Sequence, residues 1–125
     1  MSGVTLDAGA LIALDRNDRR IIALLARAAE TGARVTVPST ALAQAIREPA
    51  KQARLARLIR QPKTRVEPLD AAGATQVGLL LTATRTADIA DAHVVICAKQ
   101  HDDLIVTSDP DDLRQLSPRA RILAV

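Results

Sequence analysis

The sequence has no phenylalanine, tyrosine or tryptophan among its 125 residues. Domains that stack nucleic-acid bases on aromatic side chains, such as RRM and OB-fold domains, are therefore excluded. The interior must be filled by Leu, Ile, Val and Ala. Any contact with a nucleic acid must depend on charge, hydrogen bonds or a metal ion.

Cysteines and long apolar runs are also scarce. The single Cys97 cannot form a disulfide framework. Apolar runs such as residues 94–98 fall far short of the ~20 residues that cross a bilayer. Asp7 interrupts the N-terminal stretch that would be apolar in a secretory signal. We therefore expect a single cytoplasmic domain, residues 1–125, without a membrane-spanning segment.

The formal net charge of +3 conceals two segments of opposite sign. Residues 47–65 contain seven basic side chains and one acid, and residues 88–112 contain seven acids and one lysine. A basic segment favours a polyanionic partner, whereas clustered acids favour divalent cations. Either segment could also be an ordinary solvated helix face. Together they fit a protein that holds a phosphate backbone beside a metal site.

Short β-branched runs alternate with helical patterns along the chain. We predict strands at 4–6, 34–37, 103–107 and 121–125, and either a strand or an extended link at 66–69. We predict helices at 18–31, 39–46, 50–60, 70–84, 86–98 and 110–116. This alternation indicates an α/β domain whose parallel sheet is covered by helices on both faces.

Two acids directly follow predicted strands, and a third lies early in a helix. Asp7 comes after 4–6, Asp109 comes after 103–107, and Asp91 shares a helix face with Asp88. The carboxyl ends of parallel strands form the functional crevice of an open sheet. Carboxylates that meet there would repel one another unless Mg²⁺ or Mn²⁺ lay among them. Each of these acids could instead be a helix cap.

Three strings in the chain strengthen the metal interpretation. They are Val4-Thr-Leu-Asp7-Ala-Gly-Ala-Leu-Ile-Ala-Leu, Asp91-Ala-His-Val-Val-Ile-Cys-Ala and Ile105-Val-Thr-Ser-Asp109-Pro-Asp-Asp112-Leu. Their residues, order and spacing resemble PIN-domain ribonucleases, in particular the VapC toxins of toxin–antitoxin pairs. The resemblance extends from Val4 to the C-terminus.

The resemblance implies a three-layer α/β/α PIN-like domain with a central parallel sheet. It also implies Mg²⁺- or Mn²⁺-dependent endonucleolytic cleavage of RNA, with Asp7, Asp91 and Asp109 as catalytic and metal-binding residues. Asp88 and Asp112 match further acids of the family, and Thr107 is another supporting candidate. The implied partners are an RNA substrate, a small antitoxin encoded next to the protein, and a second copy of the chain.

The chain departs from the family pattern at Gln44, where the second family acid usually lies. An amide can accept a hydrogen bond but supplies no charge. Glu48, one helical turn further on, could substitute for the missing acid, and Gln44 and Glu48 are both kept as supporting candidates. The departure leaves open an alternative, a catalytically inactive PIN-like module that binds RNA or protein.

The basic segment supplies the candidate RNA contacts, which are Arg47, Lys51, Arg54 and Arg57. Arginine and lysine side chains of this kind would position a phosphate backbone without reading its sequence. A phosphoryl-accepting receiver domain is less compatible with the sequence, because receivers carry an adjacent acid pair after the first strand and Asp7 is followed by Ala8. His93 and Cys97 could share a helix face as zinc ligands. They have no second pair, however, and we expect them in the core.

Overall fold

Among residues 3–125, which the computed structural model describes, five short strands form one sheet with all neighbours parallel. In chain order they are β1 (Val4–Leu6), β2 (Val35–Pro38), β3 (Thr64–Glu67), β4 (Leu104–Thr107) and β5 (Ile122–Ala124). Across the sheet the order is β3-β2-β1-β4-β5. The central strands consist mainly of Val, Ile, Leu and Thr, as expected for strands buried on both faces.

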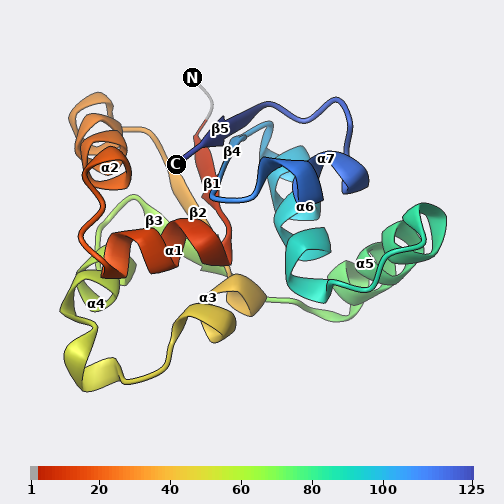
Figure 1. Cartoon of the computed structure of the whole chain (residues 1–125), viewed down its shortest axis with the longest axis horizontal. Coiled ribbons are helices and arrows are strands. Elements are labelled where there is room, and N and C mark those ends of the chain that lie inside the picture. Colours follow the sequence, from red (N-terminus) through yellow and green to blue (C-terminus); the bar gives the residue numbers. More distant parts are fainter. Residues whose placement is uncertain (1–2) are drawn as a thin grey trace.

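Helices cover both faces of this sheet. They are α1 (Ala8–Asp15), α2 (Arg19–Thr31), α3 (Ser39–Ala45), α4 (Ala53–Ile59), α5 (Ala71–Thr84), α6 (Ile89–His101) and α7 (Pro110–Leu116), with a short 3₁₀ turn, η1 (Pro49–Lys51). Figure 1 shows α1, α2 and α4 on one side of the sheet, α6 and α7 on the other, and α5 beyond α6. The predicted three-layer α/β/α fold is confirmed.

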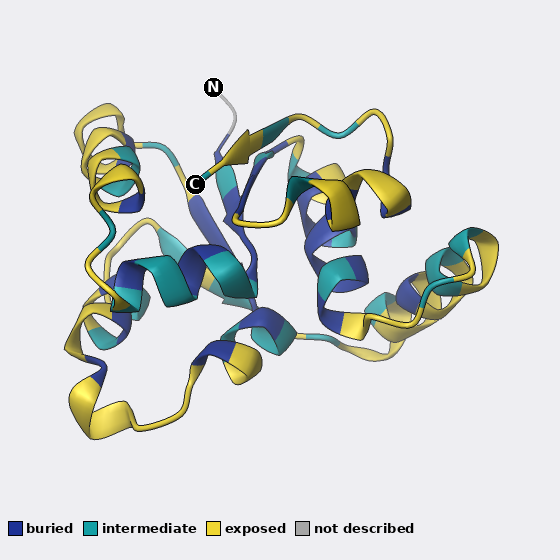
Figure 2. Cartoon of the chain, viewed as in Figure 1, coloured by how far each residue is buried: buried dark blue, intermediate teal, exposed yellow. Residues whose placement is uncertain are grey.

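Aliphatic side chains fill most of the core between these layers. Leu6, Leu11, Ile21, Ile105 and Leu113 are among the side chains that are almost completely shielded from solvent. Figure 2 shows that burial concentrates in the central strands and α6, whereas α2 and α5 remain largely exposed. The outer helices therefore offer surface for interactions with other molecules.

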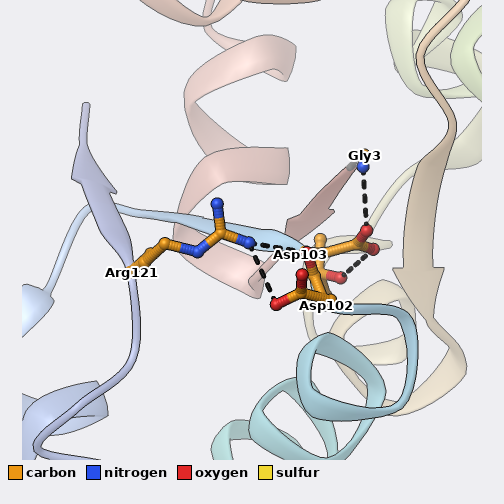
Figure 3. Close-up of polar contacts among 5 residues, drawn as sticks. Gly3, Asp102, Asp103 and Arg121 are labelled. Atoms are coloured by element: carbon orange, nitrogen blue, oxygen red, sulfur yellow. Dashed lines mark hydrogen bonds and ion pairs between the residues drawn. The ribbon is translucent and has the colours of Figure 1, made fainter. Parts of the chain in front are cut away.

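A buried acid fastens the N-terminal end of the sheet. Asp103, which is 5% exposed, accepts hydrogen bonds from the backbone N–H of Gly3 (3.0 Å) and the hydroxyl of Thr5 (2.9 Å). Beside it, Arg121 donates to the backbone carbonyl of Asp102 at 2.6 Å (Figure 3). Asp102 and Asp103 come just before β4, so these two acids of the acidic segment lie away from the strand ends where the site was predicted.

The strand order reverses at β1, and the candidate site lies at this reversal. The chain runs from β1 to β2 and β3 in one direction, and then returns to the other side of β1 to form β4 and β5. The carboxyl ends of β1 and β4 are therefore adjacent at a topological switch point, where open α/β sheets bind their ligands. Asp7 follows β1 directly, and Asp109 lies two residues beyond β4.

Most predicted elements are present, with three differences. Helix α1 was not among the predicted helices, although Asp7 caps it. The extended stretch predicted at 66–69 is a regular strand that begins earlier, at Thr64, because residues 64–67 pair with β2. The segment predicted as one helix over 50–60 contains η1 and then α4. Within residues 3–125, none of the helices has the length and apolar character to cross a membrane.

Candidate active site

Asp7 is held in place by both of its carboxylate oxygens. It caps the N-terminus of α1, where Oδ1 accepts the backbone N–H of Ala10 at 2.8 Å, and Oδ2 accepts the hydroxyl of Thr107. The residue is only 4% exposed. Burial raises the pKa of Asp7, the two hydrogen bonds partly offset this effect, and the charge of Asp109 adds to it.

Thr107 connects the two strand ends. It is the last residue of β4 and is fully buried. Its Oγ1 donates to Asp7 and accepts the backbone N–H of Asp109 at 2.8 Å. One hydroxyl therefore sets the distance between the loops that carry the two acids. The Asp109 carboxylate itself makes no capping bond to α7.

Gly9 allows α1 to approach the loop after β4. A Cβ at this position would lie 1.9 Å from Oγ and 3.1 Å from Cβ of Ser108. Any larger residue would therefore require Ser108 to move. The glycine in the string after Asp7 is explained by this close approach, which brings Asp7 and Asp109 to the same edge of the sheet.

Asp91 contributes a third carboxylate from the first turn of α6. Its backbone N–H donates to Oδ1 of Asp88 at 2.9 Å, so Asp88 is the N-cap of this helix. The pKa of Asp91 is raised to about 7, first by burial and then by the charges of Asp88, Asp7, Asp112 and Asp109. The five acids thus share one electrostatic environment. The cap interpretation is confirmed for Asp7 and Asp88, and their role in an active site stays a prediction.

Asp112 lies at the exposed margin of this cluster. A hydrogen bond with Asp109 and the charge of Asp109 raise the pKa of Asp112, with smaller contributions from burial and from Asp88. Its position on the first turn of α7 keeps it one helical turn from Asp109. The cluster therefore extends from a buried side, at Asp7, to a solvent-exposed side, at Asp112.

The chemistry of these residues fits a hard divalent cation. Every donor is a carboxylate oxygen, and the raised pKa values of Asp7, Asp91 and Asp112 indicate negative charge without a compensating cationic side chain. Within residues 3–125, no three His, Cys, Asp or Glu side chains are arranged to hold a metal ion directly. This arrangement is compatible with Mg²⁺, which retains several waters and often contacts one or two carboxylates.

The two supporting candidates near the basic segment have different surroundings. Gln44 is exposed in the last turn of α3. Glu48 is also exposed and pairs with Lys51 at 3.0 Å. The charges that most strongly raise the pKa of Asp91 come from other aspartates. The proposed substitution of Glu48 for the missing family acid stays a prediction.

The four candidate RNA contacts are exposed and fall into two groups. Arg47 donates to the backbone carbonyls of Ala43 and Ile46 at the end of α3, and Lys51 pairs with Glu48. Arg54 and Arg57 lie on α4 and line an apolar groove. Their predicted contact with RNA stays a prediction.

His93 has a structural environment. It is 2% exposed, and its Nδ1 is hydrogen-bonded to Oγ1 of Thr40 at 2.7 Å, which joins α6 to α3. Cys97 is likewise buried, and burial raises the pKa of its thiol to about 12. The expected core location of both residues is confirmed.

Comparison with known proteins agrees with the fold. The PIN domain family model matches residues 4–117. The chain belongs to the PIN domain family, and the resemblance seen in the sequence is confirmed at that level. Among curated protein sequences, none is significantly similar to this chain.

Two solved structures are similar over nearly the whole chain. One is VapBC2 from Rickettsia felis bound to a DNA fragment from its promoter, with a TM-score of 0.68 and 13% identity over 98% of both chains. The other is FitAB bound to an IR36 DNA fragment, with a TM-score of 0.66 and 15% identity over 97% of this chain and 94% of that one. At these identities the likeness establishes a shared fold.

Proposed function

We propose that the protein is a Mg²⁺- or Mn²⁺-dependent endoribonuclease and the toxin of a type II toxin–antitoxin pair. The observation that carries this proposal is the acidic cluster at the switch point, where burial and four neighbouring aspartates raise the pKa of Asp91 to about 7. Membership of the PIN family supports nuclease chemistry, and the similarity to chains of VapBC2 and FitAB supports a toxin–antitoxin context.

In the proposed mechanism, Asp7, Asp91 and Asp109 would hold the cation, in part through the waters that Mg²⁺ retains. When bound, the cation supplies an activated water and neutralises negative charge on the reacting phosphodiester. Asp7 enters this arrangement with one oxygen bound by Ala10 and the other by Thr107, so its orientation is set before the substrate arrives. Asp88 orients the start of α6 and so positions Asp91.

The proposed partners are an RNA, a small antitoxin protein and a second copy of the chain. The acidic cluster is a natural socket for an antitoxin arginine or lysine, which would compete with the cation and hydrogen-bond the carboxylates. Arg47 and Lys51 are exposed and can contact a phosphate backbone. We place this activity in the cytoplasm, where RNA is available.

An RNA cleavage assay with added Mn²⁺ or Mg²⁺, and with a chelator as control, tests the proposal. We expect cleavage only with the metal, and loss of cleavage and of metal binding in Asp7→Asn, Asp91→Asn and Asp109→Asn. A matched control is Asp15→Asn, which changes an acid at the far end of α1. Cleavage at wild-type levels by all three variants would disprove the assignment. RNA binding without cleavage would favour the inactive module.

A further inference from the structure

Helix α6 buries one strongly polar side chain, the imidazole of His93. The other side chains that α6 buries belong to alanines, valines and Cys97. His93 is 2% exposed, and its Nδ1 is hydrogen-bonded to Oγ1 of Thr40 at 2.7 Å. An aliphatic side chain could fill the same space without a polar group to satisfy, so packing alone does not explain the histidine. What distinguishes this pair from an aliphatic one is a directional bond between two elements.

The Thr40–His93 bond lies at the edge of the sheet that carries the candidate active site. Thr40 is the second residue of α3, which begins directly after β2 ends at Pro38. Strand β2 runs parallel to β1, so it ends at the same edge of the sheet as the strand that precedes Asp7. His93 lies two residues after Asp91 in α6, which packs against α3 (Figure 1). The bond therefore joins the helix that carries Asp91 to the carboxyl end of β2.

Asp91 and His93 point to opposite sides of α6, because two residues turn an α-helix by about 200°. Asp91 faces the four aspartates whose charges act on it, whereas His93 faces α3. The tip of a side chain lies about 5–6 Å from the helix axis, so a rotation of α6 by about 20° would move the Asp91 carboxylate by about 2 Å. A displacement of about 1 Å can reduce a reaction rate about 100-fold. The rotation of α6 about its axis therefore decides where this carboxylate lies.

The other interactions of α6 restrain this rotation less strictly. Hydrophobic contacts are non-directional, so the buried alanines and valines permit small rotations. The cap bond from Asp88 to the backbone of Asp91 lies at the start of α6 itself, so it turns with the helix. A hydrogen bond, by contrast, weakens steeply when it is bent. In the part of the chain that the structure describes, the Thr40–His93 bond is the one side-chain hydrogen bond between residues 89–98 and another element.

We propose that Thr40 and His93 are positioning residues, whose hydrogen bond sets the rotation of α6 and so the place of the Asp91 carboxylate in the acidic cluster. The inference rests on the proposed function, in which Asp91 helps to hold a divalent cation. In this role Thr40 and His93 act through Asp91 and contact neither the cation nor the RNA. None of the seven residues of α3 is charged, so a bound cation cannot attract this helix strongly enough to replace the bond.

Three variants measure the effect of the bond on the metal site. Thr40→Val keeps the size of the side chain without its hydroxyl, and should weaken Mn²⁺ binding about tenfold in isothermal titration and cleavage about 10- to 100-fold. Thr40→Ser restores the hydroxyl and should keep both values near those of the wild type. Thr40→Val combined with His93→Leu leaves no unpaired polar group, so it should unfold in urea near the wild-type midpoint and yet bind Mn²⁺ as weakly as Thr40→Val.

The matched control is Thr5→Val. Thr5 is fully buried and donates to Asp103, which lies at the opposite edge of the sheet. The variant makes the same substitution and also loses one side-chain hydrogen bond, so it should lose a comparable amount of stability. We expect wild-type Mn²⁺ affinity and wild-type cleavage per folded molecule from it. If Thr40→Val and the double variant match Thr5→Val in both measurements, the bond is only structural and the inference is wrong, while the proposed function stands.

A wild-type protein that neither binds Mn²⁺ nor cleaves RNA would contradict the proposed function instead. Hydrogen exchange of the metal-free protein then tests the bond by itself. Backbone amides at 92–95, in the first half of α6, should exchange at least about tenfold faster in Thr40→Val than in Thr5→Val, because the helix leaves its wild-type position more often. Thr40→Ser should return these rates to those of the wild type. Equal rates in Thr40→Val and Thr5→Val would overturn the inference.

Discussion

Thr107 shows how a single buried hydroxyl can organise a site made from separate loops. It donates to the Asp7 carboxylate and accepts the Asp109 backbone N–H, so both strand ends depend on it. The bond to Asp7 joins residues 100 apart in the sequence, whereas the bond to Asp109 joins residues two apart. Thr107 is fully buried and contacts the two acids, so we regard it as a positioning residue.

We expect Thr107→Val to reduce cleavage about 10- to 100-fold, because partners that orient metal-binding groups typically contribute this much. The variant should also lose about 1–3 kcal/mol of unfolding free energy, since the Asp109 N–H is left without its acceptor. Thr107→Ser retains the hydroxyl and should recover most of the cleavage activity and most of the unfolding free energy. Activity measured per folded molecule, with the Mn²⁺ dissociation constant, separates positioning from stability. Wild-type cleavage activity and a wild-type Mn²⁺ dissociation constant in Thr107→Val would contradict the positioning role of Thr107.

Gln44 and Glu48 can be distinguished by their effects on metal affinity. Gln44→Glu would add a charged oxygen near the end of α3, and we expect Mn²⁺ to bind several-fold more tightly, because hard cations prefer charged oxygen ligands. Glu48→Gln should change little, since its carboxylate already pairs with Lys51. Isothermal titration of Mn²⁺ into both variants is the test. Equal affinity in wild type and both variants would place the end of α3 away from the site.

At the scale of elements, packing within the domain leaves most of helix α5 uncovered. None of its 14 residues is charged, and only Val77 is buried. Leu79 is 67% exposed. Figure 1 shows α5 at the outer edge of the molecule, beyond α6. A neutral, apolar helix in this position suits contact with a second copy, which would present the same uncharged surface.

We therefore expect Leu79→Lys to weaken dimer formation at least about tenfold, because each protomer would bring a desolvated charge into the contact. Sedimentation equilibrium measures the dissociation constant directly. Leu123→Lys is the control, since Leu123 is another exposed leucine, 41% exposed, but lies in β5. A dimer that is equally stable in both variants would exclude α5 as the interface.

At the scale of the whole molecule, the acidic cluster opposes folding when no cation is present. The pKa of Asp91 is about 7 in the folded protein and near 3.8 in an unfolded chain. Between these values the folded state holds the proton more tightly than the unfolded state does. Rising pH therefore lowers the free energy of unfolding between the two pKa values. The destabilisation by Asp91 is complete above about pH 7.

Asp91→Asn should remove this dependence. We expect the metal-free variant to be about 1–2 kcal/mol more stable than the wild type at pH 8 and similar to it at pH 4, with the shift discounted for the partial solvent exposure of the side chain. Urea unfolding in the presence of a chelator, repeated between pH 4 and 8, measures this. Saturating Mn²⁺ should stabilise the wild type and have little effect on the variant. If the unfolding free energies of the wild type and Asp91→Asn changed in parallel with pH, the pKa of Asp91 would not be raised by folding.

The sequence by itself determined the local structure and the identity of the acids. The helices predicted to begin at residues 18 and 70 do begin there, behind the caps Asp18 and Asp70, because a capping bond involves only neighbours in the chain. Asp7 and Asp109 could be assigned to one edge of the sheet because parallel strands all end at the same side. The three strings were then sufficient to identify the PIN family.

The tertiary structure alone decided which acids lie together. Asp102 and Asp103 belong to the same charged segment as Asp91, yet they lie at the opposite end of β4, and Asp103 ties the sheet together. The strand order, which places β4 beside β1, arises from packing between distant segments. The same packing creates the groove between α2 and α4. Burial and the charges of distant neighbours set the pKa of Asp91, and neither quantity exists until the chain has folded.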